Sequence, residues 1–207
     1  MSSDFEIKVV GGLYLPTYDT HFSSMGDKLD TYQAARVTQA VSYCASPPDE
    51  IALDIGAHVG IHTRLLARAF RQVFAYEPHP HNFHCLRLNT RYHNVETFNA
   101  AVGEDAGMTW IDVVPDANSG NHQIQRCKID VAQNRIPVVT VDDLRLNSVG
   151  FLKIDVQGYE LYVLRGAAKT ILEQKPVVLF EDEPPGKLPH QFVRPGKCAK
   201  LLKSWGM

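Results

Sequence analysis

The sequence predicts an α/β protein with a Rossmann-like, doubly wound and mostly parallel sheet. From Glu50 onward, short apolar runs alternate with amphipathic stretches, as they do in repeated βαβ units. Two of these runs end in a glycine-containing turn that leads directly into a helical pattern. The chain has 207 residues, 44% of them apolar, which suffices for one core of this kind.

The strands and helices follow from the period of the apolar residues. Strands are predicted at the runs 51–55, 72–76, 95–101, 151–155 and 177–181. Helices are predicted at Ile61–Phe70, Pro80–His93 and Tyr159–Glu173. Gly, Asn and Asp clusters surround the runs MTWIDVV and PVVTVDDL, which indicates an excursion with a hairpin over 102–149 rather than another βαβ unit.

The hydrophobic pattern changes near residue 48. Before it, FEIKVV and the Gly11-Gly12 turn predict a hairpin, and Thr31–Cys44 has helical spacing that ends before Pro47-Pro48. We expect residues 1–48 to form a cap over the site and 49–207 to form the Rossmann-like domain. The last 25 residues predict one short helix.

The bulk properties argue against several classes of partner. The formal charge is −2 with interspersed charges, so the sequence carries no strong nucleic-acid or anionic-membrane signal. The four cysteines lack C-x-x-C spacing, which predicts buried free thiols. The start MSSDFEIKVV is unlike a signal peptide, and no apolar run approaches the ~18 residues of a membrane span. We expect a cytoplasmic protein.

The segment from Asp54 to Gly60 forms a glycine loop between a strand and a helix. Such a loop exposes backbone N–H groups to a nucleotide-like ligand, with Gly56 and Ala57 at the turn. Asp54 would repel a pyrophosphate but could accept hydrogen bonds from an ammonium group. S-adenosylmethionine carries an ammonium and no phosphate. The G-x-x-x-G spacing also differs from the dinucleotide pattern G-x-G-x-x-G.

The second predicted strand ends in Glu77, which comes 21 residues after Gly56. An acid at this distance can bind both hydroxyls of a ribose. Pro78 stops the strand and aims the loop beneath the adenosine. At the end of the third strand, small residues around Ala101 would let an adenine ring approach the backbone.

The fourth strand leads into Asp155, Gln157 and Glu160. Because the carboxyl ends of strands beside the switch point form the ligand crevice, Asp155 should lie beside Asp54. Glu160 stands in the first helical turn, where it either interacts with the helix dipole or, with Gln157, binds substrate. Transfer of a methyl group to oxygen requires a base.

Three residues are candidates for this base: Asp155, Glu181 after the fifth strand, and His21 from the N-terminal segment. The sequence favours Asp155 among them. Two groups of histidines could be considered as metal ligands: His79, His81 and His84, and His58 with His62. The first group is predicted in a loop and a surface helix and the second at the glycine loop, so the sequence favours the absence of a metal site.

These segments resemble the FkbM family of S-adenosylmethionine-dependent methyltransferases over roughly Ile51–Glu183. The resemblance lies in LDIGAHVG, YEPHP and FLKIDVQGYELYVLRGA. It implies the class I methyltransferase fold, and O-methylation of a small molecule or glycan. It implies cofactor contacts at Asp54, Gly56, His58, Gly60 and Glu77, and site roles for Asp155 and Glu160. LPTYDTHF is similar to a segment of some short members, which favours Asp19 and His21 as pocket residues.

One departure from the resemblance concerns the C-terminus. The chain ends where the antiparallel strand pair of this fold should begin, so we expect a sheet without that pair. Either the sheet is shortened, or the protein is a fragment, or a partner chain supplies the edge. An exposed edge would permit a homodimer. A non-catalytic S-adenosylmethionine-binding module is the main alternative function, and a nicotinamide-dependent oxidoreductase is the main alternative enzyme.

Overall fold

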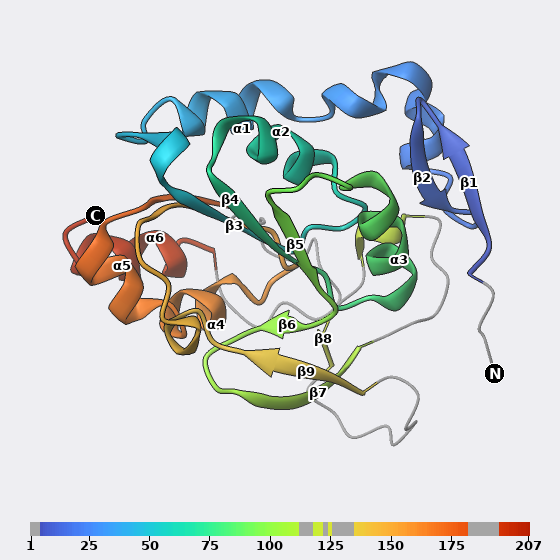
Figure 1. The fold of residues 1–207 in the computed structure, drawn as a ribbon. Coiled ribbons are helices and arrows are strands. Elements are labelled where there is room, and N and C mark those ends of the chain that lie inside the picture. The colour runs from blue at the N-terminus through green and yellow to red at the C-terminus, as the bar shows by residue number, and fades with distance from the viewer. Residues whose placement is uncertain (1–4, 112–117, 122–123, 126–134, 182–194) are drawn as a thin grey trace.

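The computed structural model describes residues 5–111, 118–121, 124–125, 135–181 and 195–207. A five-stranded parallel sheet lies at its centre in the order β11-β10-β3-β4-β5. Helices cover the sheet, and a smaller sheet follows the carboxyl end of β5 (Figure 1). The predicted α/β class with a parallel, Rossmann-like sheet is confirmed.

The central strands form where the apolar runs predict them. Their bounds are β3 Ile51–Ile55, β4 Gln72–Tyr76, β5 Val95–Phe98, β10 Val149–Ile154 and β11 Val177–Phe180. The strand order reverses direction between β3 and β10, which is the switch point of an open α/β sheet. There Lys153 pairs in register with Asp54, and the N–H of Asp155 donates to Ile55 O over 2.9 Å. Asp155 thus directly follows β10, the strand that pairs with the strand of Asp54.

The alternation of side chains along the strands decides which helices cover each face. The helices are α1 Ala34–Val41, α2 Ile61–Ala69, α3 Pro80–Asn89, α4 Glu160–Arg165, α5 Ala168–Gln174 and α6 Lys197–Ser204. Ala52 and Phe151 pack with residues of α1 and α2, and Ala75 packs against α3. Leu53 and Leu152 point to the opposite face, where they meet α4, α5 and α6.

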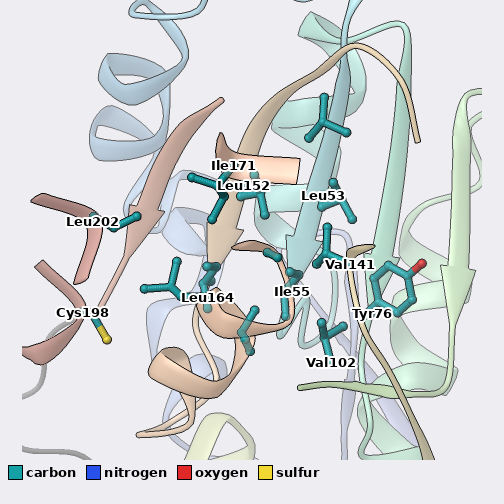
Figure 2. Packing of buried hydrophobic residues seen from close by; sticks show 14 of the residues in the cluster. Leu53, Ile55, Tyr76, Val102, Val141, Leu152, Leu164, Ile171, Cys198 and Leu202 are labelled. Atoms are coloured by element: carbon teal, nitrogen blue, oxygen red, sulfur yellow. The ribbon is translucent and has the colours of Figure 1, made fainter. Parts of the chain in front are cut away.

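Figure 2 shows the core on the α4–α6 side of the sheet. Leu53 from β3 and Leu152 from β10 lie among Leu164, Ile171 and Leu202 from the three helices. Burying side chains of this size stabilises the fold by about 1.5–3 kcal/mol each. This packing holds the carboxyl ends of β3 and β10 side by side.

The predicted third strand, 95–101, divides between two sheets. β5 ends at Phe98, and β6 Ala101–Val102 joins β9 Arg135–Val139, β7 Gly107–Ile111 and β8 Ile124–Gln125 in the order β6-β9-β7-β8. The division occurs because the Asn99 amide donates to the carbonyls of Glu77 and Pro78, both over 2.9 Å, and so ties the chain to the loop after β4. The short 3-10 helices η3 Ser119–Asn121 and η5 Asp142–Leu144 lie in the same part of the chain.

The N-terminal segment contains the predicted hairpin, with β1 Ile7–Val10 antiparallel to β2 Leu13–Pro16. Two short 3-10 helical stretches, together η1 Phe22–Thr31, meet at a kink at Gly26 and precede α1. A further 3-10 helix, η2 Pro47–Asp49, precedes β3. The helix predicted at Thr31–Cys44 is therefore shorter than expected. Gln33 has a left-handed backbone with φ of 51°, which interrupts the helical path between η1 and α1.

Two other predicted helices have different bounds in the structure. The helix predicted at 159–173 is two helices, because the Asp142 carboxylate accepts the N–H groups of Lys169 and Thr170 and caps α5 from a distant turn. α3 ends at Asn89 rather than His93, since Thr90 leaves the helical region.

The C-terminal residues form α6, as predicted. Among the residues that the structure describes, no antiparallel strand joins the central sheet. In the same residues, no helix has the length and hydropathy needed to cross a membrane.

Candidate active site

A cavity of about 550 Å³ lies at the carboxyl ends of β3, β4 and β10. Its volume is within the range of small-molecule sites. His21, Tyr32 and the loop around Ser119 supply further walls. Ten of the predicted site residues line this cavity: His21, Gly56, Ala57, His58, Glu77, Pro78, Ala101, Asp155, Gln157 and Glu181. The other four, Asp19, Asp54, Gly60 and Glu160, lie outside its lining.

The glycine loop needs its glycines for packing as well as for backbone geometry. Gly56 has φ of +77°, and a Cβ there would lie 1.8 Å from the carbonyl oxygen of Asp155. The loop thus passes directly beneath the turn after β10. Gly60 has φ of +93°, and a Cβ there would meet Leu86 on α3 and Thr90 directly after it. Gly60 therefore shapes the start of α2 rather than the cavity wall.

Asp54 is fully buried, and its two oxygens are hydrogen-bonded within the protein. Oδ1 accepts from the Lys153 ammonium over 3.0 Å, and Oδ2 accepts from the Thr63 hydroxyl over 2.6 Å. Lys153 Nζ also donates to Gly56 O over 3.1 Å. Asp54 lies outside the cavity lining, so the cofactor contact predicted for it stays a prediction. Its carboxylate positions Lys153 and the start of α2.

Lys153 keeps its positive charge in this buried position. Burial by itself would lower the pKa of Lys153, but the Asp54, Asp155 and Glu77 carboxylates outweigh it, and the pKa is raised above its ordinary value. Asp155 Oδ2 lies 3.9 Å from Lys153 Nζ. Lys153 therefore links the Asp54 carboxylate beneath the loop to the Asp155 carboxylate in the cavity.

Glu77 is buried at the end of β4 with 6% exposure, and it lines the cavity. Oε2 accepts the N–H of His58 over 2.8 Å, and Oε1 accepts the N–H of His79 over 2.9 Å. The Asn82 side chain is a third hydrogen-bond partner of the carboxylate, which still leaves Glu77 acceptor capacity for a ligand. Burial raises the pKa of Glu77 to about 7, although the two backbone donors act in the opposite direction.

This raised pKa predicts a pH dependence of stability. The folded state binds the Glu77 proton more tightly than the unfolded state, whose pKa is near the ordinary 4.5. The contribution of Glu77 to the free energy of unfolding is therefore complete below pH 4.5 and is lost as the pH rises through about 7. Between pH 5 and pH 8, the free energy of unfolding measured in urea should fall less for Glu77→Gln than for the wild type. Parallel losses in the two proteins would contradict this assignment.

Asp155, Gln157 and Glu181 follow the ends of β10 and β11. The Gln157 amide donates to Asp155 Oδ1 over 3.1 Å, and the side chain of Asp155 is one-third exposed. Glu181 continues β11 through its N–H, which donates to Ile154 O over 3.3 Å. His21 reaches the same cavity from the N-terminal segment. All three predicted bases thus line one space.

Glu160 has a structural role in this geometry. Its Oε1 accepts the N–H groups of Val156 and Gly158, each over 3.1 Å, and the side chain is 5% exposed. Gln157 and Gly158 both have positive φ, which turns these donors toward the carboxylate. Glu160 thus stabilises the turn that presents Asp155, and the substrate contact predicted for it stays a prediction.

Asp19 anchors the N-terminal segment rather than lining the cavity. Its Oδ1 accepts the N–H of Phe22 over 2.8 Å, and its Oδ2 accepts the N–H and hydroxyl of Ser119 over 2.9 and 2.5 Å. Because the Ser119 hydroxyl donates to Asp19, it accepts from His58 Nε2 over 2.6 Å. One hydrogen-bonded chain therefore joins the N-terminal segment, the loop at Ser119 and the glycine loop.

Sequence patterns do not single out several residues of the cavity wall. Lys153 could have been found, because it lies two residues before Asp155 on one strand and so shares its face. Tyr32, Asn82 and Ser119 come from segments with no motif. His62 is considered in the sequence only as a metal ligand. No group of three His, Cys, Asp or Glu residues in the described part of the chain could hold a metal ion.

Two curated methyltransferases are similar to this chain in sequence. Methyltransferase 1 of Beauveria bassiana is 28% identical over 147 residues, covering 58% of this chain and 59% of that protein. Hexuronic acid methyltransferase AglP of Haloferax volcanii is 26% identical over 160 residues, covering 74% of this chain and 62% of that protein. The chain thus spans about six tenths of the length of these curated relatives.

A solved structure supports the fold. Methyltransferase FkbM from Methylobacillus flagellatus superposes with a TM-score of 0.53 at 19% identity, covering 79% of this chain and 38% of that chain. The family model described as the methyltransferase FkbM domain matches residues 54–194. This match runs from the glycine loop past the end of β11 and includes more than half of the chain. The protein belongs to the FkbM family of methyltransferases.

Proposed function

We propose that the protein is an S-adenosylmethionine-dependent methyltransferase that methylates a hydroxyl oxygen of a small molecule or sugar. The charge in the cavity carries this proposal. Lys153 is the only Lys or Arg among the described lining residues, and a buried carboxylate holds its ammonium at 3.0 Å. Glu77, Asp155 and Glu181 line the same cavity. Such a wall favours a cationic ligand and disfavours the pyrophosphate of NAD.

The residues beside Glu77 suit the adenosine part of the cofactor. Asn82 is 2% exposed, and its amide nitrogen donates to Ser119 O over 2.8 Å. Its Oδ1 has no hydrogen-bond partner among the described residues. Two acceptors, Glu77 and Asn82 Oδ1, thus suit the two hydroxyl donors of a ribose. Ala100 and Ala101 provide a small, apolar wall for a base.

The reaction assigns separate tasks to the cavity residues. The bound cofactor supplies an electrophilic methyl group on a sulfonium. The protein must align the acceptor hydroxyl and remove its proton. We propose that Asp155 accepts this proton, because Gln157 orients its Oδ1. Glu181 and His21 are the other candidates for the base. The N-terminal segment, which lines the cavity through His21, Phe22 and Tyr32, acts as a cap that excludes water.

The acceptor class is proposed from the relatives. A curated relative is named a hexuronic acid methyltransferase. Sugar hydroxyls are weakly acidic, so a base close to the reacting oxygen suits them. We therefore place sugars first among the acceptors to be tested, with neutral glycosides beside hexuronic acids, because the carboxylates that line the cavity disfavour an anionic acceptor.

Calorimetric titration of S-adenosylhomocysteine, with NAD as the matched comparison, tests the cofactor. We expect micromolar binding of S-adenosylhomocysteine and none of NAD. The converse result would identify an oxidoreductase and overturn the proposal. Transfer of a labelled methyl group to neutral glycosides, to glucuronic acid and to its glycosides then tests the reaction. Cofactor binding without transfer to any hydroxylated acceptor would favour the non-catalytic module.

A further inference from the structure

His62 lines the cavity but has no role in the reaction proposed above. It lies in the first turn of α2, directly after the glycine loop. The residue is 8% exposed. A nearly buried imidazole in a ligand cavity needs a physical explanation, since its polar nitrogens must be either bonded or available to a ligand.

One nitrogen of His62 is fixed by the protein. Nε2 lies 3.1 Å from the carbonyl oxygen of Tyr32, which can only accept, so Nε2 carries a proton. The Tyr32 ring stacks on the imidazole at an interplanar angle of 15°. Nδ1 has no hydrogen-bond partner in the described part of the chain. In the neutral ring, Nδ1 is therefore an acceptor with an unused lone pair.

The charges around the ring keep it neutral in the free protein. Burial and the Lys153 ammonium lower the pKa of His62, while Asp54, the Tyr32 carbonyl and Asp155 act in the opposite direction. Burial and Lys153 prevail, and the pKa lies below its ordinary value. A ligand that brings a negative charge to Nδ1 would reverse this balance.

The position of His62 favours such an anion. α2 has nine residues, and its N-terminus carries a partial positive charge and N–H groups without intrahelical partners. The methionine part of the proposed cofactor carries a carboxylate and an ammonium. Glu181, which lines the cavity after β11, suits the ammonium and leaves Asp155 free to act as the base, so the carboxylate would lie on the α2 side of the cavity.

We propose that His62 binds the methionine carboxylate of the cofactor and takes up one proton from solvent when it does so. A lone pair on Nδ1 and a carboxylate are both acceptors, so they can bond only after a proton joins Nδ1. The product is an imidazolium–carboxylate pair with a charge-assisted hydrogen bond. This inference rests on the proposed function, because it requires the cofactor to carry an amino acid group.

Two ligands separate this inference from the proposed function. S-adenosylhomocysteine carries the carboxylate, whereas 5′-methylthioadenosine carries the adenosine and sulfur without the amino acid group. We expect His62→Ala and His62→Gln to weaken S-adenosylhomocysteine binding roughly 10- to 100-fold. Binding of methylthioadenosine should stay within about twofold of the wild type, which also shows that the cavity is folded. His93→Gln, an exposed histidine outside the cavity, is the control.

Proton uptake gives a second, independent readout. Titrations at pH 8 in phosphate and in Tris, which differ in ionisation enthalpy, report the protons taken up on binding. The wild type should take up protons with S-adenosylhomocysteine and none with methylthioadenosine, and His62→Gln should take up none with either. Glu77, with its pKa of about 7, is already ionised at this pH.

The outcomes are distinguishable. Unchanged affinity for S-adenosylhomocysteine in both His62 variants, or equal heats in the two buffers, would overturn the role of His62 and leave the proposed function intact. Equal losses for the two ligands would show that His62 only supports the fold of the cavity, and would also overturn it. Failure of the wild type to bind either ligand would instead contradict the proposed function.

Discussion

Lys153→Ala is expected to lower the free energy of unfolding by about 3–5 kcal/mol, the usual cost of breaking a buried ion pair. Asp54 is fully buried, and the Lys153 ammonium at 3.0 Å is its charged partner. Without it, only the Thr63 hydroxyl would stabilise the carboxylate. Urea unfolding followed by circular dichroism measures the loss.

The double variant Asp54→Asn with Lys153→Met is the matched comparison. It removes both charges, so much of the lost stability should return, because the large cost comes from leaving one charge uncompensated. Lys169→Ala, at an exposed position of α5, should change stability by less than about 0.5 kcal/mol. If Lys153→Ala lost as little stability as Lys169→Ala, the ion pair of Lys153 with Asp54 would not be a structural support of the glycine loop.

Glu77→Ala is expected to weaken the binding of S-adenosylhomocysteine by about 1–3 kcal/mol, since the ribose hydroxyls would lose a buried charged acceptor. The measurement is calorimetric titration at pH 8, where Glu77 is ionised because its pKa is about 7. Methylthioadenosine should lose the same amount, because it carries the same ribose. The His62 variants should behave differently, because they should weaken the binding of S-adenosylhomocysteine, which has a carboxylate, and not that of methylthioadenosine.

Two further variants separate binding from folding at this position. Glu77→Gln retains one acceptor oxygen for the N–H groups of His58 or His79, so it should preserve the loop better than alanine does. Glu96→Ala removes an exposed acid from β5 and should leave the affinity unchanged. Full cofactor affinity in a folded Glu77 variant would assign the ribose to other acceptors.

Much of the fold could be predicted because its signals are local. The five apolar runs, the glycine loop and the acid after β4 are each contained within a few residues, and strand ends of a parallel sheet meet at one edge. The prediction was less accurate where a distant contact sets the boundary. Asp142 divides the helix predicted at 159–173, and Asn99 divides the strand predicted at 95–101.

The site shows the same limit. The spacing of Gly56 and Glu77 was enough to bring both to one cavity. The roles of Asp54 and Asp19 depend on partners about a hundred positions away, Lys153 and Ser119. A local sequence pattern identifies an acidic residue, but it does not determine which cation or hydroxyl group will be its partner in the folded protein.

The sequence by itself determined the order of strands and helices, the glycine loop and the acids at the strand ends, because these depend on residues adjacent in the chain. Only the tertiary structure decided which acids face the cavity and which are buried beneath it. The register of β10 against β3 places Lys153 on Asp54, and the path of η1 places the Tyr32 carbonyl on His62. Hydrogen bonds and ion pairs act over a few ångströms in space, whatever the separation of their partners along the chain.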